Sequence, residues 1–525
     1  MLRLGPASHR TLWPLCIARR WTNFSSFLFP GQIRPLHNLQ QRPISWFVPS
    51  HSKKVTGVWR YLFWTGALLG SLSLFAGESS PSVFSSIQGV EWVKECAQQH
   101  PEILWLADKD VRKTEEGQAT LQGAYSEQLF GQKYVEFDRT VMTLHCLRLI
   151  LKGGDEAYET FVKNQPQEVR LSRGSFDQIH AEGQRLLQSK YEGLSELEIA
   201  ETMETALVLG DLGKSEKARE LFKPHGASAE DHDDFYGEAM EALQKHPELC
   251  PSFARLSPKA RELLGKIAHL AHYGHITHLE GGPGMFTKLK QSGIASTDPL
   301  ALSLDLFVHR VDVMGALGHN DNVSSRTYTE LAHRAIQAME EAVLTLSDPA
   351  KTEWDAYNVS VEARASWLGL SAEDPSERIL TRIGAMVRLF DPKEGALLKK
   401  GIDALDEETR KRAALQLDPQ KGELSDRNPT YVPAVLVNLL SNGELGNSKE
   451  ERLLQSIRIG IPFLTRVLET HQEMVAEGQI DPNVLLNFNP IAGSAKSSPY
   501  SLINGEFTID SKGMVSLVER DQSER

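Results

Sequence analysis

Asp211 is the residue of this chain best placed by its sequence to take part in chemistry. It lies in the run ALVLGDLGK at residues 206–214, where an apolar segment of helical character delivers a carboxylate into a turn containing Gly213 and Lys214. A lone carboxylate is costly in apolar surroundings. We therefore expect Asp211 to bind a cation or to belong to a hydrogen-bonded network.

Other histidines and aspartates follow Asp211 in an order that could complete a metal site. The candidate metal ligands are, in chain order, His180, Asp211, His232, His275, His278, Asp305, His309 and Asp312. Imidazole and carboxylate ligands together suit Fe, Mn or Zn. A mixed site of this kind can hold two metal ions with a water and a phosphate between them.

Asp305, His309 and Asp312 are spaced i, i+4 and i+7 within a predicted helix at residues 299–317. At about 100° per residue this spacing places all three on one face of the helix. They could therefore meet one metal ion. The alternative is a buried histidine held between two acids in a structural hydrogen-bond network.

His269, His272, His275 and His278 recur every third residue in a segment whose apolar pattern predicts one helix over residues 258–278. Successive side chains at this spacing drift around the helix by about 60°, so all four cannot share one site. The apolar stripe of this helix would place His275 and His278 nearest the core. It would leave the other two toward solvent.

The run at residues 206–214 resembles the signature of the HD-domain superfamily of metal-dependent phosphohydrolases, in which a helix of the form ALLHDIGK supplies adjacent His and Asp ligands. The order His, His-Asp, His, His, Asp of the larger enzymes fits residues 170–346, and it selects His232 from the acidic run at 228–234. The resemblance implies that metal ions activate a bridging water for attack on phosphorus, with Asp211 and Lys214 in the catalytic centre. Gly210 stands in place of the signature histidine. The site could therefore bind a single metal, recruit His309 as a substitute, or bind a ligand without turnover.

The segments that would position these residues are almost all helical in pattern, which predicts an all-α protein. Ser195 and Glu198 form a capping-box sequence at the start of the helix that leads to Asp211. We expect an N-terminal helical region, an HD-like helical domain, a C-terminal helical region after a polar break, and a tail whose short alternation could form a hairpin. Their expected bounds are 87–169, 170–346, 347–497 and 498–525, with the break at 418–431.

The first 77 residues contain nine Lys or Arg and no Asp or Glu. Residues 1–60 have the composition of a mitochondrial-type targeting segment, or alternatively of a basic disordered tail. The uncharged stretch at 61–77 is near the shortest length that spans a bilayer, so we predict a single transmembrane anchor followed by a linker at 78–86. The flanking charges place the N-terminus on the cytosolic or matrix side. The mitochondrial inner membrane is the candidate location.

The chain has 525 residues, and its formal net charge of −12 disfavours nucleic acid as a partner. The leading expectation is a membrane-anchored phosphohydrolase that uses Mn, Fe, Zn or Mg on a small phosphorylated molecule. One alternative is a catalytically silent helical protein that binds a partner or serves as a scaffold. Another is a di-iron oxygenase with an HD-like fold. The metal content of the protein separates the three.

Overall fold

The computed structural model describes residues 89–107, 123–229, 232–268, 270–418, 431–482 and 484–518. It is 72% helix and 2% strand, which confirms the all-α fold class. The predicted targeting segment, the anchor at 61–77, the linker and most of the polar break lie outside the described residues. Among the helices that are described, none is long and apolar enough to cross a membrane.

The first of two hydrophobic cores spans both regions expected at 87–169 and 170–346. Its helices are α2 (Val90–Gln99), α3 (Tyr125–Phe130), α4 (Val135–Lys152), α5 (Gly154–Val162), α6 (Arg173–Gln188), α7 (Glu196–Gly210), α8 (Glu216–Phe222), α9 (His232–Lys245), α10 (Pro251–Arg255), α11 (Pro258–Ile267), α12 (Tyr273–His278), α13 (Thr287–Ser292), α14 (Ile294–Thr297), α15 (Pro299–Gly315), α16 (Glu330–Leu344) and α17 (Glu353–Leu368). Short 3-10 turns connect several of them.

The second core lies in the C-terminal region. It is built by α18 (Pro375–Met386), α19 (Pro392–Asp403), α20 (Glu407–Leu417), α21 (Val432–Ser441), α22 (Lys449–Ala476), α23 (Asn489–Ser497), α24 (Ser501–Asn504), β1 (Phe507–Ile509) and β2 (Val515–Leu517). The two strands pair antiparallel in the tail, where the alternation had indicated a hairpin. Helix α17 contributes Tyr357 to the first core and Leu368 to the second.

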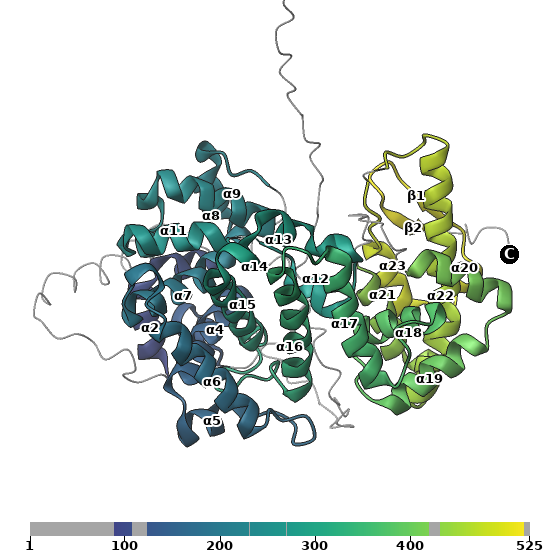
Figure 1. Ribbon diagram of the computed structural model, residues 1–525, viewed down its shortest axis with the longest axis horizontal. Coiled ribbons are helices and arrows are strands. Elements are labelled where there is room, and N and C mark those ends of the chain that lie inside the picture. The colour runs from purple at the N-terminus through teal and green to yellow at the C-terminus, as the bar shows by residue number, and fades with distance from the viewer. Residues whose placement is uncertain are drawn as a thin grey trace, which may run out of the picture. The chain divides into compact units, whose positions relative to one another are not determined.

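Helix α4 is the central element of the first core, with α15 against it (Figure 1). Every residue of α4 from Val135 to Leu151 is buried, so this helix has no solvent face. Gly315 allows the close approach of α15, because a Cβ there would lie 2.0 Å from Thr143 Oγ1. Charged residues on α4 must therefore find partners inside the protein.

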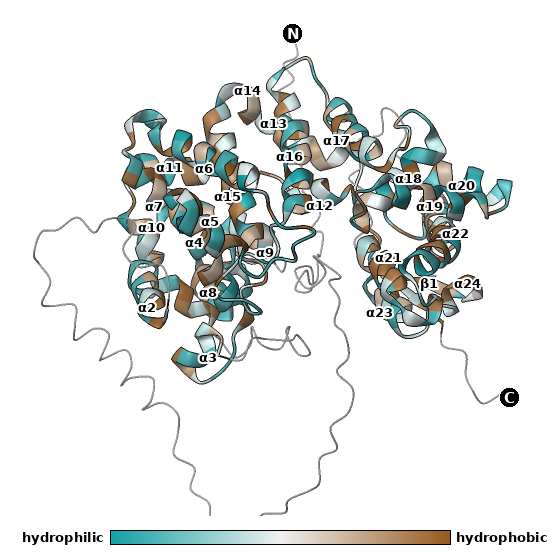
Figure 2. Ribbon diagram, turned by 90° about the horizontal axis from the view of Figure 1, so that it is seen from below, coloured by the Kyte–Doolittle hydropathy of each residue, from teal (hydrophilic) through white to brown (hydrophobic). Residues whose placement is uncertain are grey.

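Helices α20 and α21 of the second core differ in polarity, and the difference follows how deeply each helix is buried. Figure 2 shows α20 as largely hydrophilic and α21 as largely hydrophobic. This agrees with burial, since Ala413 is the buried residue of α20 whereas most of α21 is buried, including Val435 and Leu439. The apolar pattern of each segment thus decides how deeply its helix packs.

The single helix predicted over residues 258–278 is wrong. The structure has α11 up to Ile267 and a separate α12 from Tyr273, with the chain turning at Ala268, where ψ is 121°. No proline or glycine marks this turn, so the local sequence carries no signal for it. The face assignments made for the four histidines assumed one continuous helix, and they do not apply.

Candidate ligand-binding site

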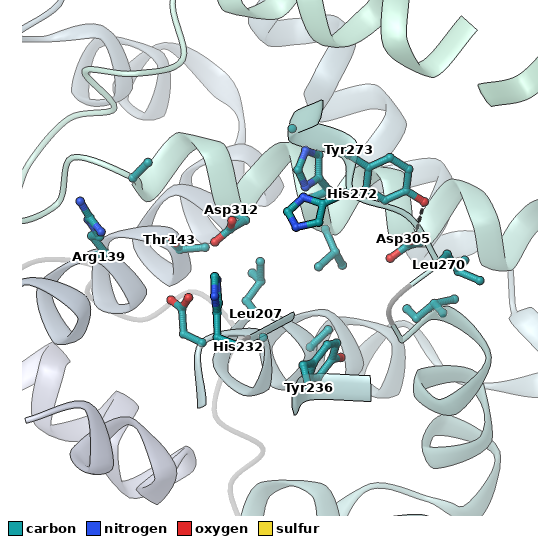
Figure 3. Close-up of a pocket in the computed structure, with 18 of the residues that line it drawn as sticks. Arg139, Thr143, Leu207, His232, Tyr236, Leu270, His272, Tyr273, Asp305 and Asp312 are labelled. Atoms are coloured by element: carbon teal, nitrogen blue, oxygen red, sulfur yellow. Dashed lines mark hydrogen bonds between the residues drawn. The ribbon is translucent and has the colours of Figure 1, made fainter. Parts of the chain in front are cut away.

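A cavity of about 330 Å³ lies among α4, α7, α9, α12 and α15 (Figure 3). Its volume falls within the range of about 300–1,000 Å³ that is typical of small-molecule sites. Arg139 and Asp312 lie toward one end of the cavity in Figure 3, and Tyr273 and Asp305 toward the other. Apolar side chains such as Leu207 complete the walls.

The cavity brings together most of the residues singled out in the sequence. The predicted site residues that line it are Asp211, Lys214, His232, Asp305, His309 and Asp312. The three from α15 share one face, as their spacing predicts, and Asp211 reaches them from the end of α7. The fold therefore gathers three of the separate sequence segments that carry predicted residues around one space.

His180, His275 and His278 do not line this cavity. The ring of His180 is hydrogen-bonded through Nδ1 to the carbonyl of Ile150 at 2.8 Å. His275 Nδ1 lies 3.0 Å from Glu280 Oε2. His278 is 7% exposed, and burial holds its pKa well below the usual range, with nearby arginines adding to the effect. Because α12 starts only at Tyr273, His272 lines the cavity instead.

Helix α7 positions Asp211. The predicted capping box is confirmed: Ser195 accepts from the Glu198 backbone while the Glu198 side chain accepts from Ser195. The helix ends at Gly210, Asp211 follows as its C-cap, and a 3-10 turn (Leu212–Lys214) carries Lys214 back over it.

The same turn explains how His232 reaches the cavity. A Cβ on Gly213 would lie 2.6 Å from the carbonyl oxygen of His232 and 2.9 Å from its Cα. Only glycine permits this approach of the α9 start to the α7 end. Gly213 is therefore needed to place His232 beside Asp211.

Four charged residues form a network at one end of the cavity, which we call the pocket quartet: Glu136, Arg139, Asp211 and Lys214. Lys214 Nζ lies 2.8 Å from Asp211 Oδ1 and 2.8 Å from Glu136 Oε2. Arg139 Nη1 lies 2.5 Å from Glu136 Oε1. The other oxygen of Asp211 accepts a hydrogen bond from Thr140 Oγ1 at 2.8 Å. Two acids and two bases make the quartet formally neutral.

The charges of the quartet stabilise one another in their ionised forms. Burial alone would raise the pKa of Glu136, but the charges of Arg139 and Lys214 overcome this and lower it to about 2. Burial alone would lower the pKa of Lys214, whereas the charges of Asp211 and Glu136 raise it above its usual value. Glu136 and Lys214 are therefore both ionised at neutral pH.

Arg139 has bonding capacity left over. Its Nη1 contacts Glu136, and its Nε points to His319 Nδ1 at 3.4 Å. Burial, followed by the charge of Arg139, lowers the pKa of His319 to about 3, so this ring is neutral and accepts the bond. Arg139 Nη2 is buried and, in the part of the chain that the structure describes, has no hydrogen-bond partner. An unsatisfied guanidinium nitrogen beside a cavity favours an anionic or strongly accepting ligand.

The opposite end of the cavity is a carboxyl group among aromatic side chains. Tyr273 donates its hydroxyl to Asp305 Oδ2 at 2.5 Å, and its ring lies 4.9 Å from that of His309. Burial raises the pKa of Asp305 to about 7, although the Tyr273 bond opposes the shift. Burial and the nearby Asp305 also raise the pKa of Tyr236. Asp305 can therefore be protonated or ionised near neutral pH.

The residues present do not fit the two-metal centre implied by the HD resemblance. Both oxygens of Asp211 are engaged, one by the cation of Lys214 and one by Thr140. Three of the expected imidazole ligands, His180, His275 and His278, are not in the cavity. Across the described ranges, no three His, Cys, Asp or Glu side chains are grouped so that they could hold a metal ion.

Several residues of the cavity were missed in the sequence. They are Glu136, Arg139 and Thr143 on α4, Tyr236 on α9, and His272 and Tyr273 at the start of α12. The residues on α4 had a detectable signal, because polar side chains at i, i+3 and i+7 share one face of a helix. The residues at α12 had none, since the turn before that helix is unmarked in the sequence.

The described fold and site define an all-α protein with a histidine-lined cavity that carries ion pairs at its charged end. Residues 97–495 match the model of DUF6829, a family of unknown function. This match covers most of the chain, so the protein belongs to that family. No curated protein and no solved structure gives a significant match to it.

Proposed function

We propose that the cavity binds a small phosphorylated molecule, and that the protein is a relative of the HD-domain superfamily in which ion pairs stand where metal ions would be held. In this proposal the protein binds its ligand without a two-metal hydrolytic step. This proposal corresponds to the expectation, based on Gly210 in place of the signature histidine, that the site binds a ligand without turnover.

The observation that carries this proposal is the pairing of Asp211 with Lys214. In the HD signature the aspartate is a metal ligand, and here its carboxylate oxygen lies 2.8 Å from a lysine ammonium instead. A cation bound in this place would have to displace Lys214 from Asp211, and it would add positive charge beside Lys214 and Arg139. Like charges confined in a buried site repel strongly. The Lys214 contact therefore favours binding without metal.

Arg139 is the evidence that the ligand carries an anionic group. The guanidinium is a planar donor that matches the geometry of phosphate oxygens. Nη2 has no partner within the described residues, and His232, His272 and His309 supply further polar groups to the walls. The apolar and aromatic end, with Leu270 and Tyr236, suits the uncharged body of the same ligand.

Ligand screening tests the proposal directly. The full chain is titrated with phosphorylated small molecules, such as nucleoside monophosphates and sugar phosphates, each compared with its dephosphorylated form by calorimetry. We expect a phosphorylated compound to bind, and Arg139→Gln to weaken this binding by about tenfold or more, since one charge-assisted contact is lost.

Lys152→Gln is the matched control, because Lys152 lies on the same helix and pairs with Glu156 at the surface. It should leave the affinity unchanged. Binding that is equal in wild type and Arg139→Gln would contradict the proposal. Turnover of a phosphorylated compound that requires added metal and is lost in Asp211→Asn would favour the hydrolase expectation instead. A redox-active iron content would favour the oxygenase.

We also propose that residues 61–77 anchor the protein in a membrane, with the mitochondrial inner membrane as the candidate. The support is the uncharged stretch itself and the basic residues before it. The full chain should remain in the membrane pellet after alkaline carbonate extraction. Release into the supernatant would contradict an integral anchor.

A further inference from the structure

Two arginines lie against the ring of Trp367, and the charge of a third acts on one of them; none of the three lines the cavity. They are Arg334 on α16, Arg364 on α17 and Arg388 just after α18, and we call them the arginine cluster. The guanidinium of Arg334 lies 4.2 Å from the Trp367 ring centroid, and that of Arg364 lies 4.9 Å from it. Arg364 is also 5.1 Å from the ring of Phe390.

The charge of this cluster is not compensated by acids. Arg364 is 3% exposed, its Nη2 donates to the Thr277 carbonyl at 2.6 Å, and its Nη1 has no partner among the described residues. Burial lowers the pKa of Arg364 to about 9, and the two further causes are the positive charges of Arg334 and Arg388. Burial lowers the pKa of Arg388 to about 10.

Arg310 is a structural comparison for the cluster, because it is a buried arginine of the same fold whose charge is compensated by carboxylates. Its guanidinium pairs with Glu340, with Nε at 3.0 Å from Oε1, and with Glu182 Oε2 at 2.5 Å. Two acids surround that one base. Within the described ranges, none of the three residues of the arginine cluster forms an ion pair with a carboxylate. A buried charge without a counter-charge is destabilising unless something else supplies one.

The backbone at Arg388 adds an independent observation. Its φ is 60°, in the left-handed region where glycine is usual at the end of a helix. The Leu389 amide donates to the Gly384 carbonyl at 2.8 Å and closes the turn. A non-glycine residue in this conformation costs about 1 kcal/mol. The chain therefore holds a large basic side chain at a position where glycine would be more stable.

We infer that the arginine cluster is a binding site for the phosphate group of a small molecule, distinct from the cavity. The geometry of a guanidinium group matches that of phosphate oxygens. The three positive charges have no carboxylate partner, so a ligand group of charge near −2, such as phosphate, compensates them better than a ligand carboxylate of charge −1. Arg334 is exposed and Arg388 is half-buried, so an anion can reach these two side chains from solvent. Arg364 is buried and adds its positive charge to the site. Half-buried Trp367 and Phe390, stacked with ring centroids 5.8 Å apart, form the apolar border.

Calorimetric titration of the full chain with inorganic phosphate tests this inference, with sodium chloride of equal ionic strength as the reference. We expect saturable binding that Arg334→Gln and Arg388→Gln each weaken by about tenfold or more. Arg458→Gln removes an exposed arginine from α22 and should leave the affinity unchanged. Arg139→Gln should also leave it unchanged, which separates this site from the proposed cavity ligand.

Thermal unfolding of Arg364→Met supplies a second test. Loss of an uncompensated buried charge should leave Tm equal or higher without phosphate, and should reduce the stabilisation that phosphate confers. No saturable phosphate binding, or binding that both Arg334→Gln and Arg388→Gln leave intact, would overturn the inference. So would phosphate binding that is lost only in Arg139→Gln.

Discussion

The two ends of helix α4 carry buried arginines in ion pairs, yet they differ in what they leave unsatisfied. Near its C-terminal end, Arg148 bonds Glu204 at 3.0 Å through Nε and Gln99 at 2.9 Å through Nη2. Near its N-terminal end, Arg139 bonds Glu136 and His319 and retains Nη2 without a partner among the described residues.

The electrostatics of the two ends are otherwise alike. Burial alone would raise the pKa of Glu204, but bonds from His100 and the charge of Arg148 lower it to about 2, as Arg139 and Lys214 do for Glu136. The difference is the cavity, which Arg139 lines and Arg148 does not. An ion pair within the core thus stabilises the fold, whereas the same pair at a cavity wall leaves a guanidinium nitrogen without a partner among the described residues.

The largest difference that we expect between the two ends of α4 is in the loss of stability when each arginine is replaced. Arg148→Met leaves Glu204 buried with only His100 as its basic partner, so we expect a loss of about 3–5 kcal/mol in the free energy of unfolding. Arg139→Met should cost less, because Lys214 still pairs with Glu136 at 2.8 Å. Urea denaturation of both variants measures the difference. Equal losses would mean that Arg139 is as structural as Arg148.

A second change would convert the pocket quartet toward the metal site of the HD signature. A Cβ on Gly210 would meet no atom within 4 Å, so a side chain can begin at this position without a clash. We expect Gly210→His alone to gain no metal, because Lys214 still holds Asp211. The double variant Gly210→His/Lys214→Met should bind Zn²⁺ measurably by calorimetry. Metal binding by the single variant equal to that of the double would show that Lys214 does not block the site.

The smallest expected effect concerns Asp305 at the other end of the cavity. Its pKa is raised to about 7 in the folded protein, above the value of about 4 in the unfolded chain. Between these values the folded state binds more protons, so this group makes stability fall as pH rises from about 4 to 7. Asp305→Asn should remove this contribution, about 2 kcal/mol between pH 5 and 7. Urea titrations at both pH values test it, and an unchanged slope would contradict the assignment.

The sequence predicted the elements whose signals are local. Ser195 and Glu198 marked the start of α7, and the i, i+4, i+7 spacing of Asp305, His309 and Asp312 placed them on one face of α15. The histidines at 272–278 were misassigned because the turn at Ala268 carries no breaker residue.

Partners across helices were not predictable from spacing. Lys214 meets Glu136 across 78 positions of the chain, so only the packed structure shows that this lysine bridges two acids. The same limit hid Arg139, whose role depends on a cavity that lies among five separate helices. Local pattern thus found the aspartates of the site, and tertiary packing decided what pairs with them.

Elemental analysis tests most directly the claim that ion pairs replace metal ions in the pocket quartet. The purified full chain is incubated with Mn²⁺, Fe²⁺ and Zn²⁺ in separate samples, desalted, and measured by inductively coupled plasma mass spectrometry beside Asp211→Asn. The account predicts far less than one bound metal ion per chain, with no difference between the two proteins. Stoichiometric metal that is lost in Asp211→Asn would contradict it.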